Sequence, residues 1–301
     1  MRKWWKRAGM LLALLLIIYL GVKPDLLVGK PGIKAESAVL MDMNSEQILM
    51  DFNGSEEIAP AGVSKLMTEL LVMEAVINGD IGWNDLVNVS LYASSVGGSQ
   101  LTLKQGEQFT VQELFEIVAV YSANDAAVAL AEHISGTEQK FVQQMNQKAT
   151  QIGLSEDTQF TNSTGLSEKL LGPNRPMEIQ GQTLMTAIDA CKLARYLLNN
   201  HPEILRISSQ MQVSMHQKGM YMSNTNWMLS SIGGPYAYDG NDGLKTGYDE
   251  DSGYHFVGTA ERDGKRLISV VFGTDTREGR FVETRKLFNY GFSGNRVRPD
   301  Y

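Results

Sequence analysis

Three short segments contain side chains that could do chemistry together. Lys65 follows Ala61-Gly62-Val63-Ser64, Ser122-Ala123-Asn124 lies in a break between apolar segments, and Lys245-Thr246-Gly247 begins a late strand-like run. A lysine amine can act as a base only when its pKa is depressed, and a second lysine nearby would depress it by like-charge repulsion. Each segment alone is weak evidence for a site, but all three in this order are hard to obtain by chance. The three segments therefore count together as one candidate site.

The three segments are of the S-x-x-K, S-D-N and K-T-G types. From about residue 37 to 292 the chain resembles low-molecular-mass penicillin-binding proteins, the serine-type D-alanyl-D-alanine carboxypeptidases of peptidase family S11. The resemblance extends beyond the motifs to Ser37–Asp42, Ser122–Glu132, Phe160–Leu166 and Arg266–Val271.

The resemblance implies an α+β fold like that of β-lactamases and penicillin-binding proteins, with an antiparallel sheet flanked by helices and a helical subdomain. It implies that Lys65 takes the proton of a nucleophilic serine, that Ser122 relays a proton and that Asn124 binds the substrate amide.

The resemblance also implies a set of substrate-binding residues. Lys245, Thr246 and Gly247 would line the strand that holds the peptide, and Arg280 would pair with its terminal carboxylate through a planar fork. Ser99 is a further candidate, although its place after Gly97-Gly98 is more typical of a turn.

Gly62 occupies the position of the nucleophilic serine. Glycine has no side chain, so no acyl-enzyme can form there. Ser64 does not replace it, because residues two apart on a helix point about 200° apart. We therefore expect hydrolysis to be nearly lost in this chain.

Asp249 is a second departure, since the resembled family usually has threonine two residues after the K-T-G glycine. A carboxylate there would repel a substrate carboxylate unless Arg280 or Lys245 pairs with it.

Secondary-structure patterns predict how these residues are positioned. Short strand patterns occur near both chain ends and amphipathic helices lie between them, which favours one sheet assembled from both ends. The predicted strands are 37–42, 47–52, 243–248, 254–260 and 267–273, and the predicted helices begin at 60, 111, 126, 138, 184 and 280. Residues 158–181 read as an extended loop.

The N-terminal 35 residues differ from the rest. Four basic residues precede a charge-free apolar run from Ala8 to Val22, which is typical of a signal peptide or a membrane anchor followed by a linker. We expect residues 36–301 to form the carboxypeptidase-like domain, with a helical subdomain at about 80–180 and no C-terminal β-domain. The domain would then act outside the cytoplasmic membrane, either anchored or secreted to the cell wall.

Charge and composition exclude several function classes. Residues 1–35 hold seven of the 27 basic and one of the 34 acidic residues, so the rest carries 20 basic and 33 acidic side chains, a net of −13. This acidic domain argues against nucleic-acid binding. The single cysteine, Cys191, excludes an intrachain disulfide, and four scattered histidines lack metal-site spacing, so we expect neither metal nor cofactor.

Three functions remain. The first is a non-catalytic protein that binds peptidoglycan stem peptides ending in D-Ala-D-Ala, binds a partner protein, or binds β-lactams without acylation. The second is an active D-Ala-D-Ala carboxypeptidase that removes the terminal D-Ala of pentapeptides, which needs a serine at 62 or a substitute for it. The third is a serine β-lactamase, which Glu168-Lys169-Leu170-Leu171 disfavours because it lacks the glutamate–asparagine loop pattern.

Overall fold

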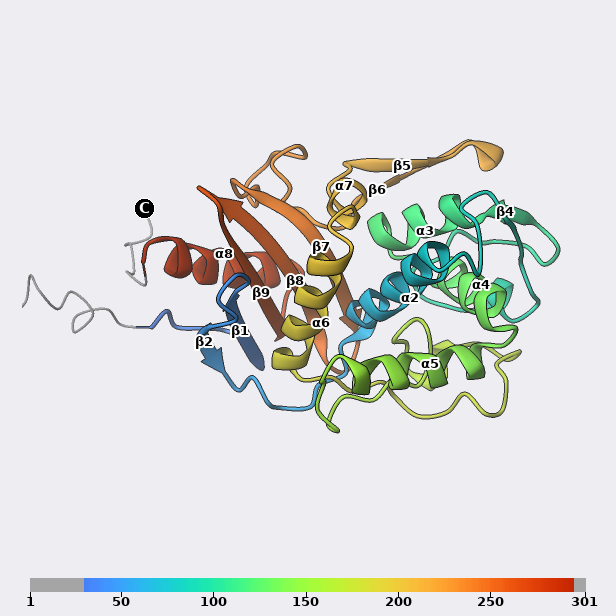
Figure 1. The fold of residues 1–301 in the computed structure, drawn as a ribbon, viewed down its shortest axis with the longest axis horizontal. Helices are drawn as coiled ribbons and strands as arrows, with labels where there is room; N and C mark the ends of the chain where they lie inside the picture. The colour runs from blue at the N-terminus through green and yellow to red at the C-terminus, as the bar shows by residue number, and fades with distance from the viewer. Residues whose placement is uncertain (1–29, 295–301) are drawn as a thin grey trace, which may run out of the picture.

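A computed structural model describes residues 30–294 of the chain. Five antiparallel strands form a central sheet in the order β2-β1-β9-β8-β7, so strands from both chain ends lie side by side (Figure 1). The strands are β1 (Ser37–Asp42), β2 (Ile48–Phe52), β7 (Asn241–Asp249), β8 (Gly253–Arg262) and β9 (Lys265–Thr274). The predicted α+β sheet built from both ends is confirmed.

Both faces of this sheet are covered. Along β1, Ala38 and Leu40 belong to one buried cluster, while Val39 and Met41 belong to another on the opposite face. This alternation follows from the two-residue period of a strand. Helix α8 (Gly279–Phe292) covers the first face, and α6 (Ala187–Asn200) covers the second, with α2 (Lys65–Ile77) packed beside α6 (Figure 1).

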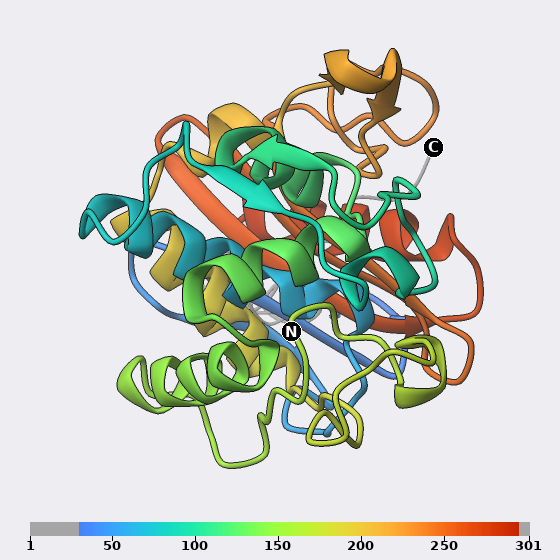
Figure 2. The same ribbon diagram turned by 90° about the vertical axis from the view of Figure 1, so that its right-hand side faces the viewer.

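Helix α2 connects the sheet to a group of helices formed by α3 (Val111–Val120), α4 (Asn124–Ser135) and α5 (Glu138–Gln151). Figure 2 shows these helices in front of the sheet. Every α2 residue from Lys65 to Met73 is buried, as expected for a helix packed on all sides. Thr110 and Glu113 form a capping box that fixes the start of α3.

Several short elements were not predicted. They are β3 (Leu86–Asn88), β4 (Gln108–Thr110), β5 (Gln212–Met215), β6 (Met220–Ser223), α7 (Ile204–Ser208) and four 3-10 turns, η2 (Ala61–Ser64), η3 (Ala93–Ser95), η4 (Glu168–Leu170) and η5 (His216–Lys218). Strands of three or four residues are too short to show a period. Helix α6 starts at Ala187 rather than at the predicted residue 184, because Thr186 is its N-cap and accepts a hydrogen bond from Asp189 N.

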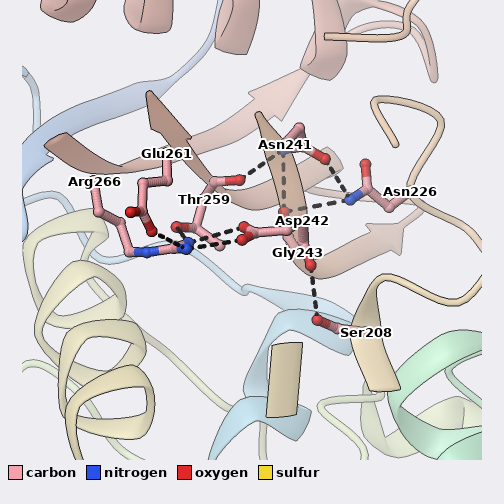
Figure 3. A network of polar contacts seen from close by, with 8 residues as sticks. All are labelled: Ser208, Asn226, Asn241, Asp242, Gly243, Thr259, Glu261 and Arg266. Atoms are coloured by element: carbon pink, nitrogen blue, oxygen red, sulfur yellow. Dashed lines mark hydrogen bonds and ion pairs between the residues drawn. The ribbon is translucent and has the colours of Figure 1, made fainter. Parts of the chain in front are cut away.

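A polar network holds the start of β7 in place, just before Lys245 (Figure 3). Arg266 on β9 grips Asp242 with two hydrogen bonds of 2.9 and 2.8 Å and also contacts Glu261 at 2.6 Å. Ser208 of α7 donates to the carbonyl of Asp242 at 3.0 Å. Bidentate arginine–carboxylate contacts fix geometry well, so this end of the strand is held firmly.

Two buried asparagines complete the network in Figure 3. Asn226 Nδ2 donates to Asn241 Oδ1 at 2.9 Å, and Asn241 Nδ2 donates to Thr259 O at 2.9 Å and to Gly243 O at 3.2 Å. These bonds tie the 224–240 loop to the sheet, next to the strand that carries Lys245.

Within residues 30–294, no helix is long and apolar enough to cross a membrane. The predicted signal peptide or anchor lies outside the described residues, apart from its linker. In the same part of the chain, no group of three or more His, Cys, Asp or Glu side chains could hold a metal ion.

Candidate active site

A cleft of about 590 Å³ lies between β7, which is the edge strand of the sheet, and the group of helices. It brings together eight of the nine residues predicted from sequence: Gly62, Lys65, Ser99, Ser122, Asn124, Thr246, Gly247 and Arg280. Lys245, the ninth, has its amine beneath the cleft floor. The structure therefore gathers side chains that are up to 218 positions apart in the chain.

Gly62 lies on the cleft floor in the 3-10 turn η2, which begins one residue earlier at Ala61. Ala61 has a φ of 47°, in the left-handed region that costs a non-glycine residue about 1 kcal/mol or more. A Cβ atom on Gly62 would lie 3.1 Å from Ser122 Oγ and 3.0 Å from Thr246 O. A side chain at 62 would thus emerge between the second and third motifs.

Lys65 begins α2 and also faces the cleft. Its Nζ donates to Thr164 O at 3.0 Å, and one turn later Thr68 Oγ1 donates to Ser163 O at 2.7 Å. The 160–166 segment is shaped by Asn162, whose Oδ1 accepts from Thr164 N at 3.1 Å and Gly165 N at 2.7 Å. The 160–166 segment therefore fixes the position of the Lys65 amine on the side away from the cleft.

The pKa of Lys65 is held well below 10.5. Burial is the largest cause, and the nearby charge of Lys245 lowers the pKa further, while the carboxylates of Glu69 and Asp125 oppose both effects. A lysine in such surroundings can hold an uncharged amine and accept a proton. The predicted like-charge effect of Lys245 is thus present, although burial outweighs it.

Lys245 is buried beneath the cleft floor. Its Nζ lies 3.3 Å from Glu69 Oε1 and donates to Val118 O of α3. Burial lowers the pKa of Lys245, and Glu69 offsets part of this effect. Glu69 was not identified from sequence, although its place four residues after Lys65 puts it on the same helix face.

Ser122 lies in the short break before α4, and Asn124 is the first residue of that helix. Ser122 has a φ of 70°, which turns the chain so that its hydroxyl faces the Gly62 position. Asn124 Nδ2 donates to Gly97 O at 2.8 Å, and its backbone N–H donates to Ser99 O at 2.7 Å. Asn124 thus holds the 97–99 turn at the cleft rim, where Ser99 contributes its carbonyl.

Arg280 is the second residue of α8 and is buried next to β7. Its Nη1 donates to Gly247 O at 2.9 Å and to His255 O at 3.4 Å, while its buried Nε has no hydrogen-bond partner among residues 30–294. Burial, aided by the charge of Arg277, lowers the pKa of Arg280 to about 9. The arginine therefore supports the K-T-G strand directly.

Asp249 also lines the cleft, and its Oδ1 accepts from Asp251 N at 2.9 Å in the turn after β7. Among the ion pairs of residues 30–294, none joins Asp249 to Arg280 or Lys245. The compensation considered from sequence is therefore not made in this structure.

Other lining residues had no recognisable sequence signal. Thr225 Oγ1 accepts a hydrogen bond of 2.8 Å from Thr246 Oγ1, and Arg277 lies over the Trp227 ring. The remaining unpredicted lining residues are Gly98, Tyr121, Leu166, Leu170, Asn224, Tyr248, Glu250 and Tyr254. Thr225 and Trp227 lie in an irregular loop without hydrophobic periodicity, so only the folded chain reveals them.

Two other serines near Gly62 are engaged in structural contacts. Ser64 is fully buried and donates to Ala61 O at 3.0 Å. Ser252 Oγ donates to Ala59 O at 2.8 Å and lies 3.0 Å from His255 Nε2. Because His255 Nδ1 accepts from Gly273 N, Nε2 carries the proton of the neutral ring, so His255 cannot act as a base towards Ser252.

His255 makes acid stability testable. Burial and Arg280 lower its pKa to about 3 from 6.5, so between these pH values the unfolded chain binds a proton that the folded chain does not. The contribution of the neutral His255 ring to the unfolding free energy is complete above pH 6.5 and is lost as the pH falls towards 3. Replacing His255→Asn should flatten the pH dependence of the unfolding free energy by roughly a few kcal/mol over this window. Urea unfolding between pH 3.5 and 7 measures this pH dependence. The control Ser252→Ala keeps the imidazole ring and should retain the pH dependence of the native chain. If His255→Asn showed the same pH dependence as the native chain, His255 would not be its source.

Comparisons with known proteins agree with this geometry. The profile of the peptidase S11 family, D-alanyl-D-alanine carboxypeptidase, matches residues 26–276. The chain is 36% identical over 271 residues to D-alanyl-D-alanine carboxypeptidase DacF of Bacillus subtilis, an alignment that covers 89% of this chain and 64% of DacF. The chain thus spans a little under two thirds of the length of the curated relatives it matches first.

Solved structures show the same fold. Penicillin-binding protein D2 of Listeria monocytogenes, in its ampicillin-bound form, has a TM-score of 0.75 and 32% identity, covering 88% of this chain and 99% of that one. A peptidoglycan synthesis regulatory factor (PBP3) of Streptococcus pneumoniae has a TM-score of 0.80 and 33% identity, covering 87% and 74%. The predicted fold, that of penicillin-binding proteins, is confirmed, and the chain belongs to the peptidase S11 family of D-alanyl-D-alanine carboxypeptidases.

Proposed function

We propose that this chain binds peptidoglycan stem peptides ending in D-Ala-D-Ala in the cleft and does not hydrolyse them. Family membership supports the ligand class. The cleft keeps Lys65, Ser122, Asn124 and Thr246 around one opening, which is what recognition of such a peptide requires. β-Lactams would bind in the same cleft without a covalent bond.

The observation that carries the loss of hydrolysis is Gly62. The position that faces both Ser122 Oγ and Thr246 O has no side chain. Ser64 and Ser252 are held by Ala61 O and Ala59 O, and the ring next to Ser252 is a donor rather than a base. A peptide carbonyl in this cleft therefore meets Lys65 without the hydroxyl that the lysine would activate.

Strand β7 provides the means of holding a peptide. It is the edge strand of the sheet, and Thr246 and Gly247 lie on the cleft side. An edge strand has backbone groups free to pair with an added extended segment, so main-chain hydrogen bonds would align the peptide along β7. Arg277 and Arg280 at the end of the cleft would attract its carboxylate, and Asp249 would weaken that attraction.

Binding without turnover is the expected result for the full chain. Titration with an N-acetylated peptide ending in D-Ala-D-Ala, followed by NMR or calorimetry, should give saturable binding, while released D-Ala stays at the level of the uncatalysed reaction. Intact-protein mass spectrometry after incubation with penicillin should show no added drug mass. Absence of peptide binding would contradict the proposal. A drug adduct on a serine would favour the active carboxypeptidase instead.

The cellular site of action follows from the same proposal. Peptidoglycan lies outside the cytoplasmic membrane, and the basic and apolar residues 1–22 have the composition of an export signal or anchor. We place the domain on the outer side of that membrane, tethered or released. Fractionation of cells that express the full chain tests this, and recovery in the cytosol would contradict it.

A further inference from the structure

A buried acid lies directly below the cleft. Glu69 is 2% exposed and sits one helical turn after Lys65 on α2. Its Oε1 is 3.3 Å from Lys245 Nζ and has no other polar partner in the described part of the chain. A carboxylate removed from water this completely is costly unless a cation compensates it, so Glu69 and Lys245 depend on each other.

The amine of Lys245 lies away from the cleft lining. Thr246 and Gly247, the next two residues of β7, line the cleft, whereas Lys245 Nζ points to Glu69 and to Val118 O of α3 beneath the floor. Lys65, by contrast, lines the cleft. The two lysines of the site thus occupy different levels, although both are almost completely buried.

We propose that Glu69 is a positioning residue: its carboxylate holds the Lys245 amine beneath the cleft floor, so that Lys65 is the lysine that a ligand meets. A lysine has a long flexible stem and a strongly hydrated head. Without the carboxylate, the ammonium would turn towards water, and the cleft lined by Thr246 is the adjacent open space. The inference concerns the cleft to which the proposed function assigns the peptide.

Charges from neighbouring elements are consistent with this arrangement. Lys65 and Lys245 repel each other, and Glu69 lies near both, while Asp125 of α4 adds negative charge on the Lys65 side. Moving Lys245 up into the cleft would bring its charge closer to the Lys65 amine, disfavouring protonation of Lys65 still more, and would leave Glu69 uncompensated. Both effects oppose the movement as long as Glu69 is ionised.

The experiment is residue-resolved reductive methylation of lysines in the full chain, with formaldehyde and a borohydride reductant at pH 7, read by peptide mass spectrometry. In the native chain Lys245 should react much more slowly than Lys65. In Glu69→Gln, which keeps the volume but removes the charge, Lys245 should react at least about tenfold faster, corresponding to about 1.4 kcal/mol of lost restraint.

Glu74→Gln is the matched control. Glu74 lies on the same helix and pairs with Lys148 at 2.7 Å, away from the cleft. This variant should accelerate Lys148 and leave Lys245 unchanged. If Glu69→Gln does not fold, as judged by near-ultraviolet circular dichroism, Glu69→Asp retracts the carboxylate by one methylene and should give a smaller acceleration of Lys245.

Three outcomes overturn the inference: Lys245 reacting as fast as Lys65 in the native chain, Lys245 unchanged in the Glu69 variants, or Lys245 equally accelerated by Glu74→Gln. Repeating the reaction with saturating D-Ala-D-Ala peptide separates the inference from the proposed function. If the peptide fails to protect Lys65 in the native chain, the binding function is contradicted, and the Lys245 rates still decide whether Glu69 positions that lysine.

Discussion

The Gly62→Ser variant should acquire D-Ala-D-Ala carboxypeptidase activity and become acylated by penicillin, whereas the native chain should do neither. Lys65 lies three residues away on the same helix start, with a pKa well below 10.5, and Ser122 and Thr246 flank the position. Loss of a serine nucleophile in a protease costs roughly a million-fold in turnover. We therefore expect a gain on the order of 10⁴- to 10⁶-fold, measured as D-Ala released per enzyme.

The lower end of that range allows for the limited space around a side chain at position 62. The new Cβ would lie 3.0 Å from the backbone oxygen of Thr246 and 3.1 Å from Ser122 Oγ. Both contacts are shorter than ordinary van der Waals distances, so η2 and β7 must separate by a few tenths of an ångström. The Ser122 side chain can rotate away, but the Thr246 carbonyl belongs to a strand held by the network around Asp242.

Gly62→Ala is the control, because it adds the same Cβ without a hydroxyl. Gly62→Ala should bind the peptide with the same affinity as Gly62→Ser. It should show no turnover and no drug adduct. Activity in both variants, or a drug mass that maps to a serine other than 62 in the Ser variant, would show that another nucleophile operates. An inactive, correctly folded Gly62→Ser chain would place a second defect in the site, with Asp249 the first residue to test.

The motif residues could be predicted because their chemistry is local. A glycine followed three residues later by lysine at a helix start, and Ser122-Ala123-Asn124 before an alanine-rich helix, specify both an element and a site. The sheet could be predicted because β1, β8 and β9 are long enough to show strand patterns. The four short strands and the loop that carries Thr225 and Trp227 lack a period, so their positions depend on tertiary contacts.

The sequence could not predict that the Lys65 side chain lines the cleft while the Lys245 amine lies beneath its floor. The sequence places Lys245 beside Thr246 on a strand, but whether its amine lies in the cleft or beneath it depends on Glu69, 176 residues earlier in the chain. The acid could have been noticed from its four-residue spacing to Lys65 on a largely apolar helix. Its partner could not, because only packing of α2 against the sheet brings Glu69 and Lys245 together.

The cleft floor depends on a second glycine, and this gives the other large expected effect. Gly165 has a φ of 76°, and a Cβ there would lie 2.0 Å from Ala61 O and 2.2 Å from Ser64 Oγ. Ala61 and Ser64 are the first and last residues of η2, so a side chain at 165 would collide with the turn that contains Gly62. With a side chain at position 165, the 161–166 loop and the η2 turn cannot both keep their positions.

Gly165→Ala should therefore lower the unfolding free energy by roughly 3 to 5 kcal/mol, from left-handed strain plus the collision with backbone atoms. Gly153→Ala is the matched control, since Gly153 has a φ of 73° but nothing within 4 Å of the added Cβ. It should lose only about 1 kcal/mol. Urea unfolding of both variants measures the difference, which isolates the contact with η2. Equal losses would mean that the 161–166 loop can move away from the turn, and that Gly165 does not fix the floor on which Gly62 and Lys65 lie.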